Sequence, residues 1–523
     1  MTNLANIKVI YFLLGRALFA ITITFAIPII YAVELQRIDL VIPFAFLMSL
    51  TLVVGAIFTY AGRGHNRRVQ VIESAIVMIV IWILLAVFGA IPFIFTQWLS
   101  PVDAILETVS DLTAASVSFL PKTAPYILRI WQSTLMWLGS FIFLSILVTI
   151  LPEVSGCFGL ELSLSQGQIF SPMIGQMREM AKKILIIYEF LTFVSFIMFK
   201  LAGLNNWDAV LMAMRCISTG GGDYFPYKYS LYVEYAAMFS MLIACGNFLL
   251  YFRLFYTLVP PASSLHLNKK VKLLDFAKHI RHLLIEFLVL LRRNILSNCK
   301  IFFSNSEVKF LLMTILGGTL LIFFSVFSKN YIVDGNESFR IAMFHVISYM
   351  STTGVDTVDI TKVPDFNRYF LFLMVIIGGC MGSVTGGLKI IRIIVLFKLA
   401  AIEVTKTLHP RMITNIKVNG VSVPMKVVGR ILTFFFMCTV TLFIFSVILS
   451  LSGQPFSKSV AMSLACMTNV GTLPGICETA DFMALPAIMK LFCCIILIAG
   501  RMEIFAFFIL ISYVHLRNDS HKW

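Results

Sequence analysis

Charged residues are scarce in this chain. Only 13% of its 523 residues are Asp, Glu, Lys or Arg, about half the share usual in a soluble domain. Hydrophobic residues make up 59%, and one soluble core cannot bury that much apolar surface, because cores stop growing near about 250–300 residues. Apolar runs long enough to cross a bilayer recur, for example at residues 9–32, 69–95, 310–327 and 485–513. We therefore predict an integral membrane protein.

The chain also lacks the motifs of a membrane enzyme. It has no His-Glu-x-x-His zinc motif and no Gly-x-Ser-x-Gly nucleophile motif. Its 10 cysteines show no paired metal-ligand spacing, and we expect them to be small buried hydrophobic residues. We therefore expect no enzymatic activity, no covalent cofactor and no zinc site.

The net charge is +15, but its distribution argues against nucleic acid as a partner. Basic residues concentrate in alternate connections between the apolar runs, and the intervening connections are mixed or acidic. This asymmetry is typical of membrane proteins that follow the positive-inside rule, and it places both termini and the basic loops in the cytoplasm. The basic residues are Arg63, Arg67, Arg68, Lys182, Lys183, Lys269, Lys270, Lys272, Lys278, Arg281, Arg292, Arg293, Lys300, Lys398, Lys406, Arg411 and Lys417. The acidic residues of the intervening connections are Glu34, Asp39, Asp103, Glu107, Asp356, Asp359, Asp365, Glu478 and Asp481.

After two leading apolar segments, the chain repeats one pattern four times. Each unit has a long apolar helix, a short segment that ends in Ser, Thr, Asn or Gly, and a second long apolar helix. The short segments, at 102–119, 207–222, 338–357 and 456–474, are too short to cross a bilayer. Irregular backbone at membrane depth is tolerated only where protein or a water-filled cavity surrounds it. We therefore predict an all-α membrane protein with four helix–pore-loop–helix repeats around a central pore and two N-terminal transmembrane helices.

The predicted units follow these changes in hydropathy and charge. They are the two N-terminal helices at 1–66, pore repeat 1 at 67–155, pore repeat 2 at 183–258, a basic, amphipathic cytoplasmic linker at 259–305, pore repeat 3 at 306–400 and pore repeat 4 at 423–515.

The tips of the short segments suit a dehydrated monovalent cation. Such an ion needs a ring of carbonyl or hydroxyl oxygens in place of its hydration shell. Glycine permits the backbone conformations that point successive carbonyls inward, and Ser and Thr add hydroxyl oxygens. The short helix before each tip directs its partially negative C-terminus toward the pore. The candidate filter residues are Thr113, Ala115, Ser116, Ser218, Thr219, Gly220, Thr352, Thr353, Gly354, Asn469, Val470 and Gly471.

Several motifs together resemble the Trk/Ktr/HKT superfamily of K⁺ transporters, and in particular the bacterial Trk-type potassium uptake membrane subunit. They are Ser-Thr-Gly-Gly at 218–221, Met-Ser-Thr-Thr-Gly at 350–354, Gly-Gly-Cys-Met-Gly-Ser-Val-Thr-Gly-Gly-Leu-Lys at 378–389, His-Pro-Arg at 409–411, Asn-Val-Gly at 469–471 and Gly-Arg-Met-Glu-Ile-Phe at 500–505. The resemblance implies that K⁺ is the transported ion and is held by backbone carbonyls of four pseudo-equivalent loops. It also implies a homodimer in the lipid of the bacterial cytoplasmic (inner) membrane and a cytoplasmic regulatory subunit that binds a nucleotide of the NAD or ATP type.

One position departs from the family pattern. Aligned on the loop tips, Ser116 corresponds to Gly220, Gly354 and Gly471, whereas the family usually has Gly in the first loop as well. In the plant branch of the superfamily, Ser at this position is associated with Na⁺ permeation. A Cβ atom and a hydroxyl would narrow the ring at this point. A Na⁺-permeable transporter, or one that couples K⁺ to Na⁺ or H⁺, therefore stays open as an alternative.

A polar, glycine-rich stretch interrupts the apolar run that ends near residue 400. Glycines four residues apart also suit helix packing, but the Ser and Thr among them favour a broken helix that lines a cavity. Arg501 lies in the last apolar run, and such a charge is expected to face a cavity or a partner because it is costly at membrane depth. In the family, the corresponding stretch is a gating loop beneath the filter, and the corresponding arginine contacts it. The candidate gate residues are Gly378, Gly379, Gly382, Ser383, Gly386, Gly387, Lys389 and Arg501.

A pore and an alternating-access carrier predict different repeat patterns. A carrier typically has inverted repeats with helix breaks at matching positions in two halves. This chain has four units in the same direction and one clear break, which favours potential-driven uptake through a pore.

Overall fold

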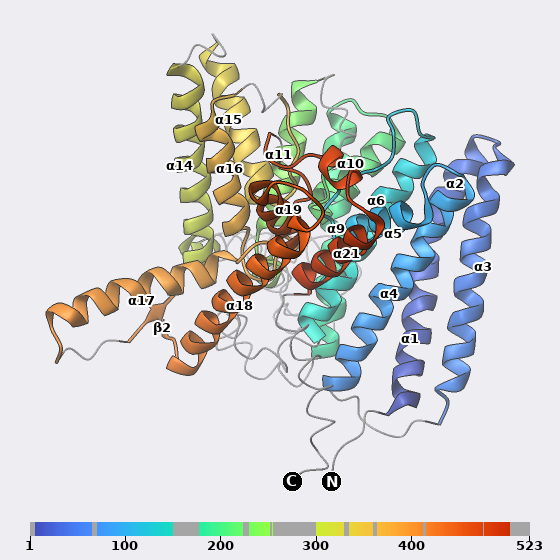
Figure 1. Ribbon diagram of the computed structural model, residues 1–523, viewed down its shortest axis with the longest axis horizontal. Coiled ribbons are helices and arrows are strands. Elements are labelled where there is room, and N and C mark those ends of the chain that lie inside the picture. The colour runs from blue at the N-terminus through green and yellow to red at the C-terminus, as the bar shows by residue number, and fades with distance from the viewer. Residues whose placement is uncertain are drawn as a thin grey trace, which may run out of the picture.

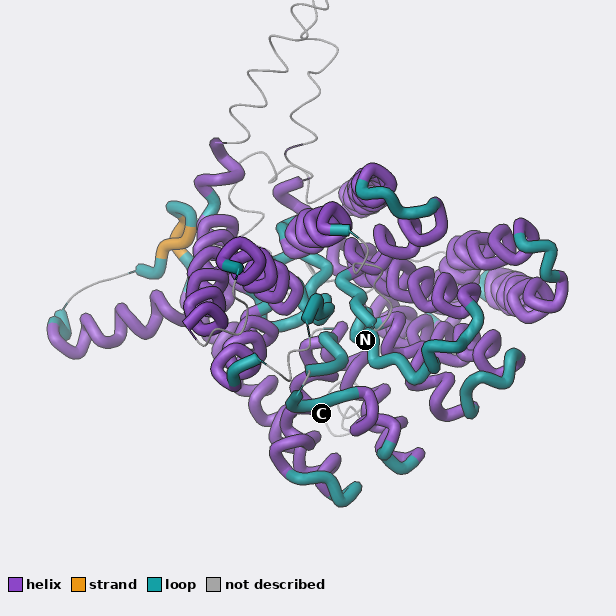
Figure 2. Tube along the Cα trace, turned by 90° about the horizontal axis from the view of Figure 1, so that it is seen from above, coloured by secondary structure: helices purple, strands orange, loops and turns teal. Residues whose placement is uncertain are grey.

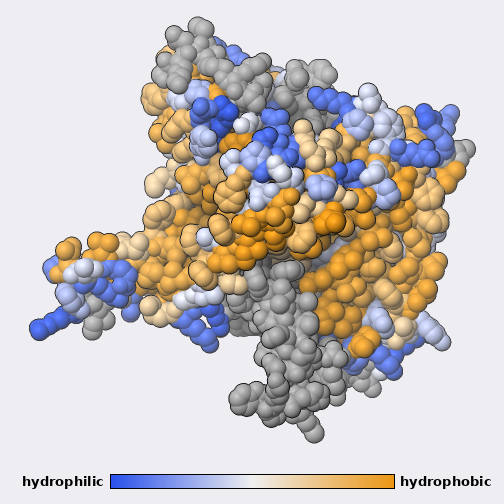
Figure 3. Space-filling view, viewed as in Figure 1, coloured by the Kyte–Doolittle hydropathy of each residue, from blue (hydrophilic) through white to orange (hydrophobic). Residues whose placement is uncertain are grey.

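The structure is a computed structural model of the chain, and it describes residues 6–64, 71–149, 177–222, 230–251, 254, 300–328, 334–358, 363–411, 415–473 and 475–502. Its regular elements are helices, apart from a short antiparallel hairpin of β1 (Lys417–Val418) and β2 (Val421–Ser422) (Figure 1). Within the described residues, 6 helices are long and apolar enough to cross a membrane. Figure 3 shows an apolar band on the outer helices between hydrophilic ends. The predicted fold class, an all-α membrane protein, is confirmed.

The two leading apolar segments form a helical pair at one edge of the molecule (Figure 1). The first segment contains α1 (Ile7–Thr22), a short turn η1 (Ile23–Phe25) and α2 (Ala26–Glu34), and the second is α3 (Ile38–Ala61). A Cβ atom on Gly15 of α1 would lie 2.7 Å from the Gly55 carbonyl oxygen of α3. Small residues therefore let these helices approach closely, as is common in membranes.

In each of the four units, a helix of 12–16 residues packs against the first helix and the last helix of the unit. In the third unit, the last helix ends at Ile377 and has only 13 residues. The first unit has α4 (Val71–Phe95), α5 (Pro101–Leu112) and α6 (Tyr126–Thr149), and the second has α9 (Met177–Leu201), α10 (Asn206–Ser218) and α11 (Leu231–Cys245). The third has α14 (Ser306–Ser328), α15 (Gly335–Met350) and α16 (Asp365–Ile377), and the fourth has α18 (Met425–Ser450), α19 (Phe456–Thr468) and α21 (Ala487–Arg501), with the short α20 (Thr479–Met483) before α21.

Three of the short helices begin with side-chain caps. The side chains of Ser100, Asn205 and Asp334 each accept a hydrogen bond from a backbone N–H in the first turn of α5, α10 and α15. Helix α19 instead begins directly after Pro455. Such caps satisfy N–H groups that have no partner within the helix, so these sequences specify where each short helix starts.

Helix α17 (Ile390–Leu408) projects away from the helical body and lies beside the β1–β2 hairpin (Figures 1 and 2). It passes through residue 400, where the sequence predicts the end of pore repeat 3. The predicted linker 259–305 lies outside the described residues, apart from residues 300–305. The other predicted unit boundaries stay predictions.

Candidate functional site: a ring of four loops and the loop beneath it

The four short helices end in the same way. A backbone N–H in each loop donates to the carbonyl oxygen five residues earlier, and the residue just before this donor has a left-handed φ. The donor and acceptor pairs are Ala115–Ser110 (2.8 Å), Gly220–Arg215 (2.9 Å), Thr353–Ser348 (2.9 Å) and Val470–Ala465 (3.1 Å). The left-handed residues are Ala114 (φ +58°), Thr219 (+60°), Thr352 (+58°) and Asn469 (+54°). The four loops therefore leave their helices along one shared backbone path.

This shared path corrects the predicted alignment of the second loop by one residue. The residue after each N–H donor is Ser116, Gly221, Gly354 or Gly471. Gly221, and not Gly220, is therefore equivalent to Ser116. The Ser-Thr-Gly string does not reveal this shift, because the register depends on which N–H closes the helix.

The loops approach one another around a closed ring. A Cβ atom on Gly471 would collide with the Ala115 carbonyl oxygen, and one on Gly221 would collide with that of Thr353. A Cβ atom on Gly354 would lie 3.3 Å from the Val470 oxygen. The fourth loop thus meets the first, the second meets the third, and the third meets the fourth. A Cβ atom on Gly222 would lie 3.8 Å from the Ser116 Cβ. The second loop therefore also meets the first, and the ring is closed.

The candidate filter residues are buried except for Gly354, which is partly exposed. Two hydroxyls are turned back onto their own helices, because Thr113 donates to Val109 O (2.8 Å) and Ser218 donates to Arg215 O (3.1 Å). Asn469 donates from its side-chain amide to Leu497 O at 3.0 Å. Backbone carbonyls are therefore the oxygens that all four loops can offer in a common arrangement.

Ser116 carries its side chain at a left-handed backbone position, with φ +61°. Its hydroxyl lies 3.9 Å from the sulfur of Met136 on α6. Met136 Sδ would also lie 2.6 Å from a Cβ atom on Gly220. The Ser116 side chain is therefore packed against α6, between the first two loops.

The loops are supported in three different ways: by a serine hydroxyl in the first and third loops, by an arginine in the second, and by a backbone bridge in the fourth. In the first loop, the Ser110 hydroxyl accepts from Val117 N at 2.6 Å, and in the third the Ser348 hydroxyl accepts from Val355 N at 2.7 Å. In the second loop, Arg215 takes the equivalent position and donates from Nη1 to Gly221 O at 3.0 Å. In the fourth loop, the equivalent residue is Ala465.

The fourth loop has its own bridge beyond the ring. Leu473 and Cys477 exchange backbone hydrogen bonds of 2.8 and 2.7 Å. Nearby, outside the spans, Lys458 donates to Asp481 at 2.6 Å, and this hydrogen bond raises the pKa of Lys458. The bridge holds the fourth loop without a polar side chain at position 465.

The predicted break in the third unit is present between α16 and α17. The chain leaves α16 at Gly378 and enters α17 at Ile390. The two ends of the intervening loop are joined by backbone hydrogen bonds from Leu388 N to Ile376 O (2.9 Å), from Lys389 N to Ile377 O (3.1 Å) and from Ile390 N to Gly379 O (3.0 Å). Gly378, Gly382 and Gly387 have positive φ, as these tight turns require.

This loop lies directly against the ring. Gly386 N donates to the Thr352 hydroxyl at 2.9 Å, and the Thr219 hydroxyl lies 3.5 Å from Val384 O. A Cβ atom on Gly386 would collide with the Thr468 carbonyl oxygen. The loop therefore contacts the second, third and fourth units at once.

Two buried cations hold the loop in this position. Arg501 donates to Val384 O at 2.8 Å and to the Ser140 hydroxyl at 2.6 Å. The Lys389 ammonium lies inside the loop, where it donates to Thr385 O and lies 3.4 Å from Ser383 O. The predicted gate residues are thus brought together in space.

Sequence reasoning missed Glu307, which is buried at the start of α14. Its carboxylate accepts from Met381 N of the loop at 2.9 Å and from the Asn247 amide at 3.0 Å. The available signal was a charged residue directly before an apolar run, whereas Arg501 was identified as a charge inside such a run.

Glu107 corrects another expectation. The sequence placed it among the acidic residues of an outer connection, but it is fully buried behind the first loop. Its carboxylate accepts from Phe119 N at 2.5 Å, from the Ser118 hydroxyl at 3.1 Å and from the Gln132 amide. Asp103 does lie near the surface, where it pairs with Lys490 at 2.6 Å. The carboxylate of Glu107 therefore braces the exit of the first loop.

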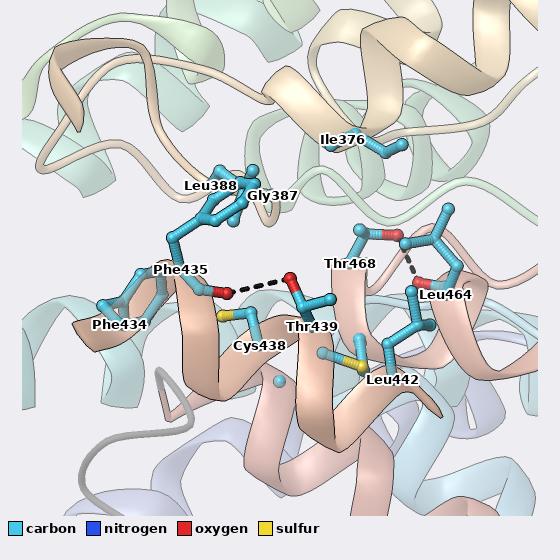
Figure 4. A pocket seen from close by; sticks show the side chains of 12 residues that line it. Ile376, Gly387, Leu388, Phe434, Phe435, Cys438, Thr439, Leu442, Leu464 and Thr468 are labelled. Atoms are coloured by element: carbon cyan, nitrogen blue, oxygen red, sulfur yellow. Dashed lines mark hydrogen bonds between the residues drawn. The ribbon is translucent and has the colours of Figure 1, made fainter. Parts of the chain in front are cut away.

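An apolar cavity of about 220 Å³ lies beside the loop (Figure 4). Gly387 and Leu388 of the loop line one side of it. Phe435 and Cys438 of α18 line another side, together with Leu464 of α19. The loop therefore borders space that no side chain of the described residues fills.

Comparison with known proteins decides the family. The family model described as "TrkH: Cation transport protein" matches residues 41–521. The chain belongs to the TrkH family of cation transport proteins. Within this family, it is 26% identical over 528 residues to the "Trk system potassium uptake protein TrkG" of Escherichia coli K12, with 98% of this chain and 99% of that protein covered. It is 24% identical to the "Trk system potassium uptake protein TrkH" of Halomonas elongata, with 97% and 98% covered.

The fold is that of a solved TrkH structure. The crystal structure of the potassium transporter TrkH from Vibrio parahaemolyticus matches with a TM-score of 0.79 and 24% identity, and 96% of this chain and 98% of that chain are covered. The four-unit arrangement therefore has an experimentally determined counterpart in the TrkH family.

Proposed function

We propose that this protein takes up K⁺ across the bacterial cytoplasmic membrane through the ring of four loops. The observation that supports the proposal best is the closed ring itself, in which each loop meets the next through a glycine and a carbonyl or a side chain. Oxygens held at fixed spacing by such contacts suit a dehydrated cation. The relatives named as potassium uptake proteins favour K⁺ as that cation. Uptake is driven by the membrane potential, which contributes roughly 2.3 kcal/mol per 100 mV for one charge.

The filter in this proposal is built from backbone carbonyls near the caps of α5, α10, α15 and α19. The hydrogen bond that closes each helix is the same in all four loops, which supports equivalent positions for the carbonyls that follow it. The partially negative C-termini of the four helices point at the ring and favour a cation there.

The loop 378–389 acts as the gate. It lies against the ring, and Arg501 places a guanidinium beneath it that opposes the passage of a cation. Opening requires the hydrogen bonds from Gly386 N to Thr352 and from Arg501 to Val384 O to separate. The apolar cavity beside Gly387 and Leu388 gives the loop room to move.

The assembly is a homodimer with a cytoplasmic nucleotide-binding regulatory subunit of the NAD or ATP type, and both termini are cytoplasmic. Helix α17 supports the dimer, since it projects from the helical body (Figure 1). Its side chains Phe397, Val404 and Leu408 are exposed. The resemblance implies the regulatory subunit, and the names of the relatives, which describe them as parts of a Trk system, support the presence of a partner.

Na⁺ permeation is the alternative that Ser116 raises. The Ser116 hydroxyl packs against Met136 of α6. This placement keeps the hydroxyl from narrowing the ring and favours K⁺.

A flux experiment in liposomes tests the proposal. Purified protein is reconstituted, an inside-negative potential is imposed, and uptake of Rb⁺ and Na⁺ is measured. We expect Rb⁺ uptake that follows the potential and exceeds Na⁺ uptake. A rate of uptake that does not depend on the membrane potential, or counterflow without net flux, would contradict a pore. Equal Rb⁺ and Na⁺ uptake would favour the Na⁺-permeable alternative.

Arg501→Ala tests the gate in the same liposomes. We expect basal Rb⁺ flux to rise several-fold, because the contact with Val384 O and the opposing charge are both lost. Arg340→Ala is the control, since Arg340 pairs with Glu234 at 2.5 Å and with Glu337 at 3.5 Å, and neither carboxylate belongs to the ring or to the loop 378–389. Unchanged flux in Arg501→Ala would remove Arg501 from the gate.

A further inference from the structure

The loop 378–389 has two arms that contact different parts of the molecule. The ring arm, residues 383–387, contacts the Thr352 hydroxyl of the third loop and the guanidinium of Arg501. The anchor arm, residues 379–382, instead contacts the chain that follows α11 and the start of α14. The contacts of the anchor arm therefore lie away from the ring.

Backbone contacts join the anchor arm to the end of α11. Cys380 N donates to Cys245 O at 2.9 Å, and Phe248 N donates to Gly382 O at 3.3 Å. A Cβ atom on Gly379 would lie 2.8 Å from the same Cys245 oxygen. The anchor arm therefore lies along the chain that leaves α11, with no room for a side chain at its first residue.

One side chain completes this attachment. Glu307 of α14 accepts from Met381 N of the anchor arm at 2.9 Å through one carboxylate oxygen. Through the other oxygen it accepts from the Asn247 amide at 3.0 Å. The Asn247 side-chain oxygen in turn accepts from Leu249 N at 2.9 Å. A single carboxylate thus joins α14, the anchor arm and the chain after α11, because both of its oxygens can accept at once.

Glu307 is itself held by a helix terminus. It is the second residue of α14, and its backbone N–H donates to the Asn305 side-chain oxygen at 2.8 Å. Its side chain is 0% exposed, so water does not compete for the two acceptor oxygens. A group fixed on a helix positions its partners more precisely than a group on a loop. Glu307 can therefore serve as a fixed point for the anchor arm.

We propose that Glu307 is a positioning residue of the gate, whose carboxylate fixes the anchor arm and so keeps the ring arm against the four loops. The inference rests on the proposed function and adds the residue that sets the resting position of the loop. Val384 follows Met381 by only three residues, so a movement of the anchor arm carries over to the contact between Val384 O and Arg501. Release of Met381 N makes separation of that contact easier.

Glu307→Gln tests the role with little change in shape. The introduced amide has one acceptor oxygen and one donor nitrogen, so it cannot accept from both Met381 N and Asn247. We expect basal Rb⁺ flux in liposomes to rise about fivefold, because the loop leaves the ring more often. The Rb⁺/Na⁺ uptake ratio should stay within about twofold of wild type, since no contact within the ring is removed. General damage to the fold would lower the flux or the ratio instead.

A second variant exchanges donor and acceptor. In Glu307→Gln combined with Asn247→Asp, the amide at position 307 accepts from Met381 N and donates to the carboxylate at position 247, so both contacts are restored. We expect basal flux to return to within about twofold of wild type. Glu307→Asp keeps a carboxyl group but is one methylene shorter, so it cannot reach both partners, and we expect it to raise basal flux as Glu307→Gln does.

Glu403→Gln is the matched control. It makes the same change in an exposed carboxylate of α17 that pairs with Lys406 at 3.1 Å, and basal flux should stay at the wild-type value. Thermal unfolding in detergent checks that each variant is folded. If Glu307→Gln does not fold, the comparison of Glu307→Asp with the exchange variant takes its place.

Wild-type Rb⁺ flux decides the proposed function, and the variants decide this inference. If the wild type conducts but Glu307→Gln shows wild-type or lower basal flux, Glu307 does not position the gate. A rise in flux that the exchange variant does not reverse would show that the contacts with Met381 N and Asn247 are not its cause. Wild-type flux in Glu307→Asp would likewise contradict a role that depends on reaching both partners.

Discussion

In the first and third units, a serine hydroxyl accepts from a backbone N–H just beyond the ring, from Ser110 and Ser348. In the second unit, Arg215 stands at the same place and donates to a carbonyl oxygen instead. In the fourth unit, the position is Ala465, and a backbone bridge between Leu473 and Cys477 holds the loop. The backbone path of the helix cap is common to all four units, whereas the support behind it differs in kind.

The difference shows what a pore made from one chain can do. In a symmetric tetramer, each substitution would change all four loops together. In this chain, each loop can have its own supporting residues. A buried charge such as that of Arg215 is present once, whereas a symmetric tetramer would contain four copies of it around the pore. The first loop uses the same freedom at the ring position, where Ser116 replaces the glycine of the other three loops.

The largest expected effect comes from adding a Cβ atom at the ring position of the fourth loop, which is glycine in the second, third and fourth loops. In Gly471→Ala, the methyl group would collide with Ala115 O, and φ at this position is +86°. We expect Rb⁺ flux in liposomes to fall at least about tenfold, because left-handed backbone strains alanine and the ring cannot close.

Gly317→Ala is the control for this substitution. A Cβ atom on Gly317 of α14 would meet nothing within 4 Å, and this glycine is helical. Its flux and thermal stability should stay at or above those of the wild type. Wild-type flux in Gly471→Ala would show that the fourth loop is not packed into the ring as described.

A smaller effect is expected from removing a serine support. Ser348→Ala leaves Val355 N without its hydroxyl acceptor, so we expect the free energy of unfolding in detergent to fall by about 1–3 kcal/mol. The Rb⁺/Na⁺ ratio should fall as the third loop loosens. Ser450→Ala, which removes an exposed hydroxyl bonded to Val447 O, should change neither quantity. Equal losses in the two variants would mean that Ser348 is not a special support.

The smallest effect is expected at the ring position, where the first loop has Ser116 and the other three loops have glycine. Ser116→Gly relieves left-handed strain but gives the unfolded chain more freedom, so stability should change by less than about 1 kcal/mol. Because the Ser116 hydroxyl faces Met136, the Rb⁺/Na⁺ ratio should stay within about twofold of wild type. A much larger ratio in the glycine variant would indicate that Ser116 admits Na⁺.

The spans, the four short helices and the break before Ile390 could be predicted because each leaves a local signal. Apolar length marks the spans, and capping residues such as Ser100 and Asn205 mark where short helices begin. The clustering of Ser, Thr and Gly marks the loops. These signals lie within a few residues of the feature that they specify.

The register of the second loop and the roles of Glu107 and Glu307 could not be read in this way. The register depends on which N–H closes α10, and Gly220 and Gly221 are identical in type. Glu307 accepts a hydrogen bond from Met381 N, which is 74 residues away in the sequence. Glu107 lies only four residues from the surface residue Asp103, yet it is fully buried. Charge alone does not show whether water or a backbone N–H is the partner.

The paired ends of the loop between α16 and α17 have a mechanical consequence. Three backbone hydrogen bonds join residues 376–379 to residues 388–390 at the base of the loop. If the loop is the gate that we propose, the segment beyond these bonds swings as a flap while α16 and α17 stay in place. Lipid contacts of α16 and α17 then need not change when the flap moves. Its rate of motion should be indifferent to the thickness and fluidity of the surrounding bilayer, unlike that of a pore that opens by tilting its helices.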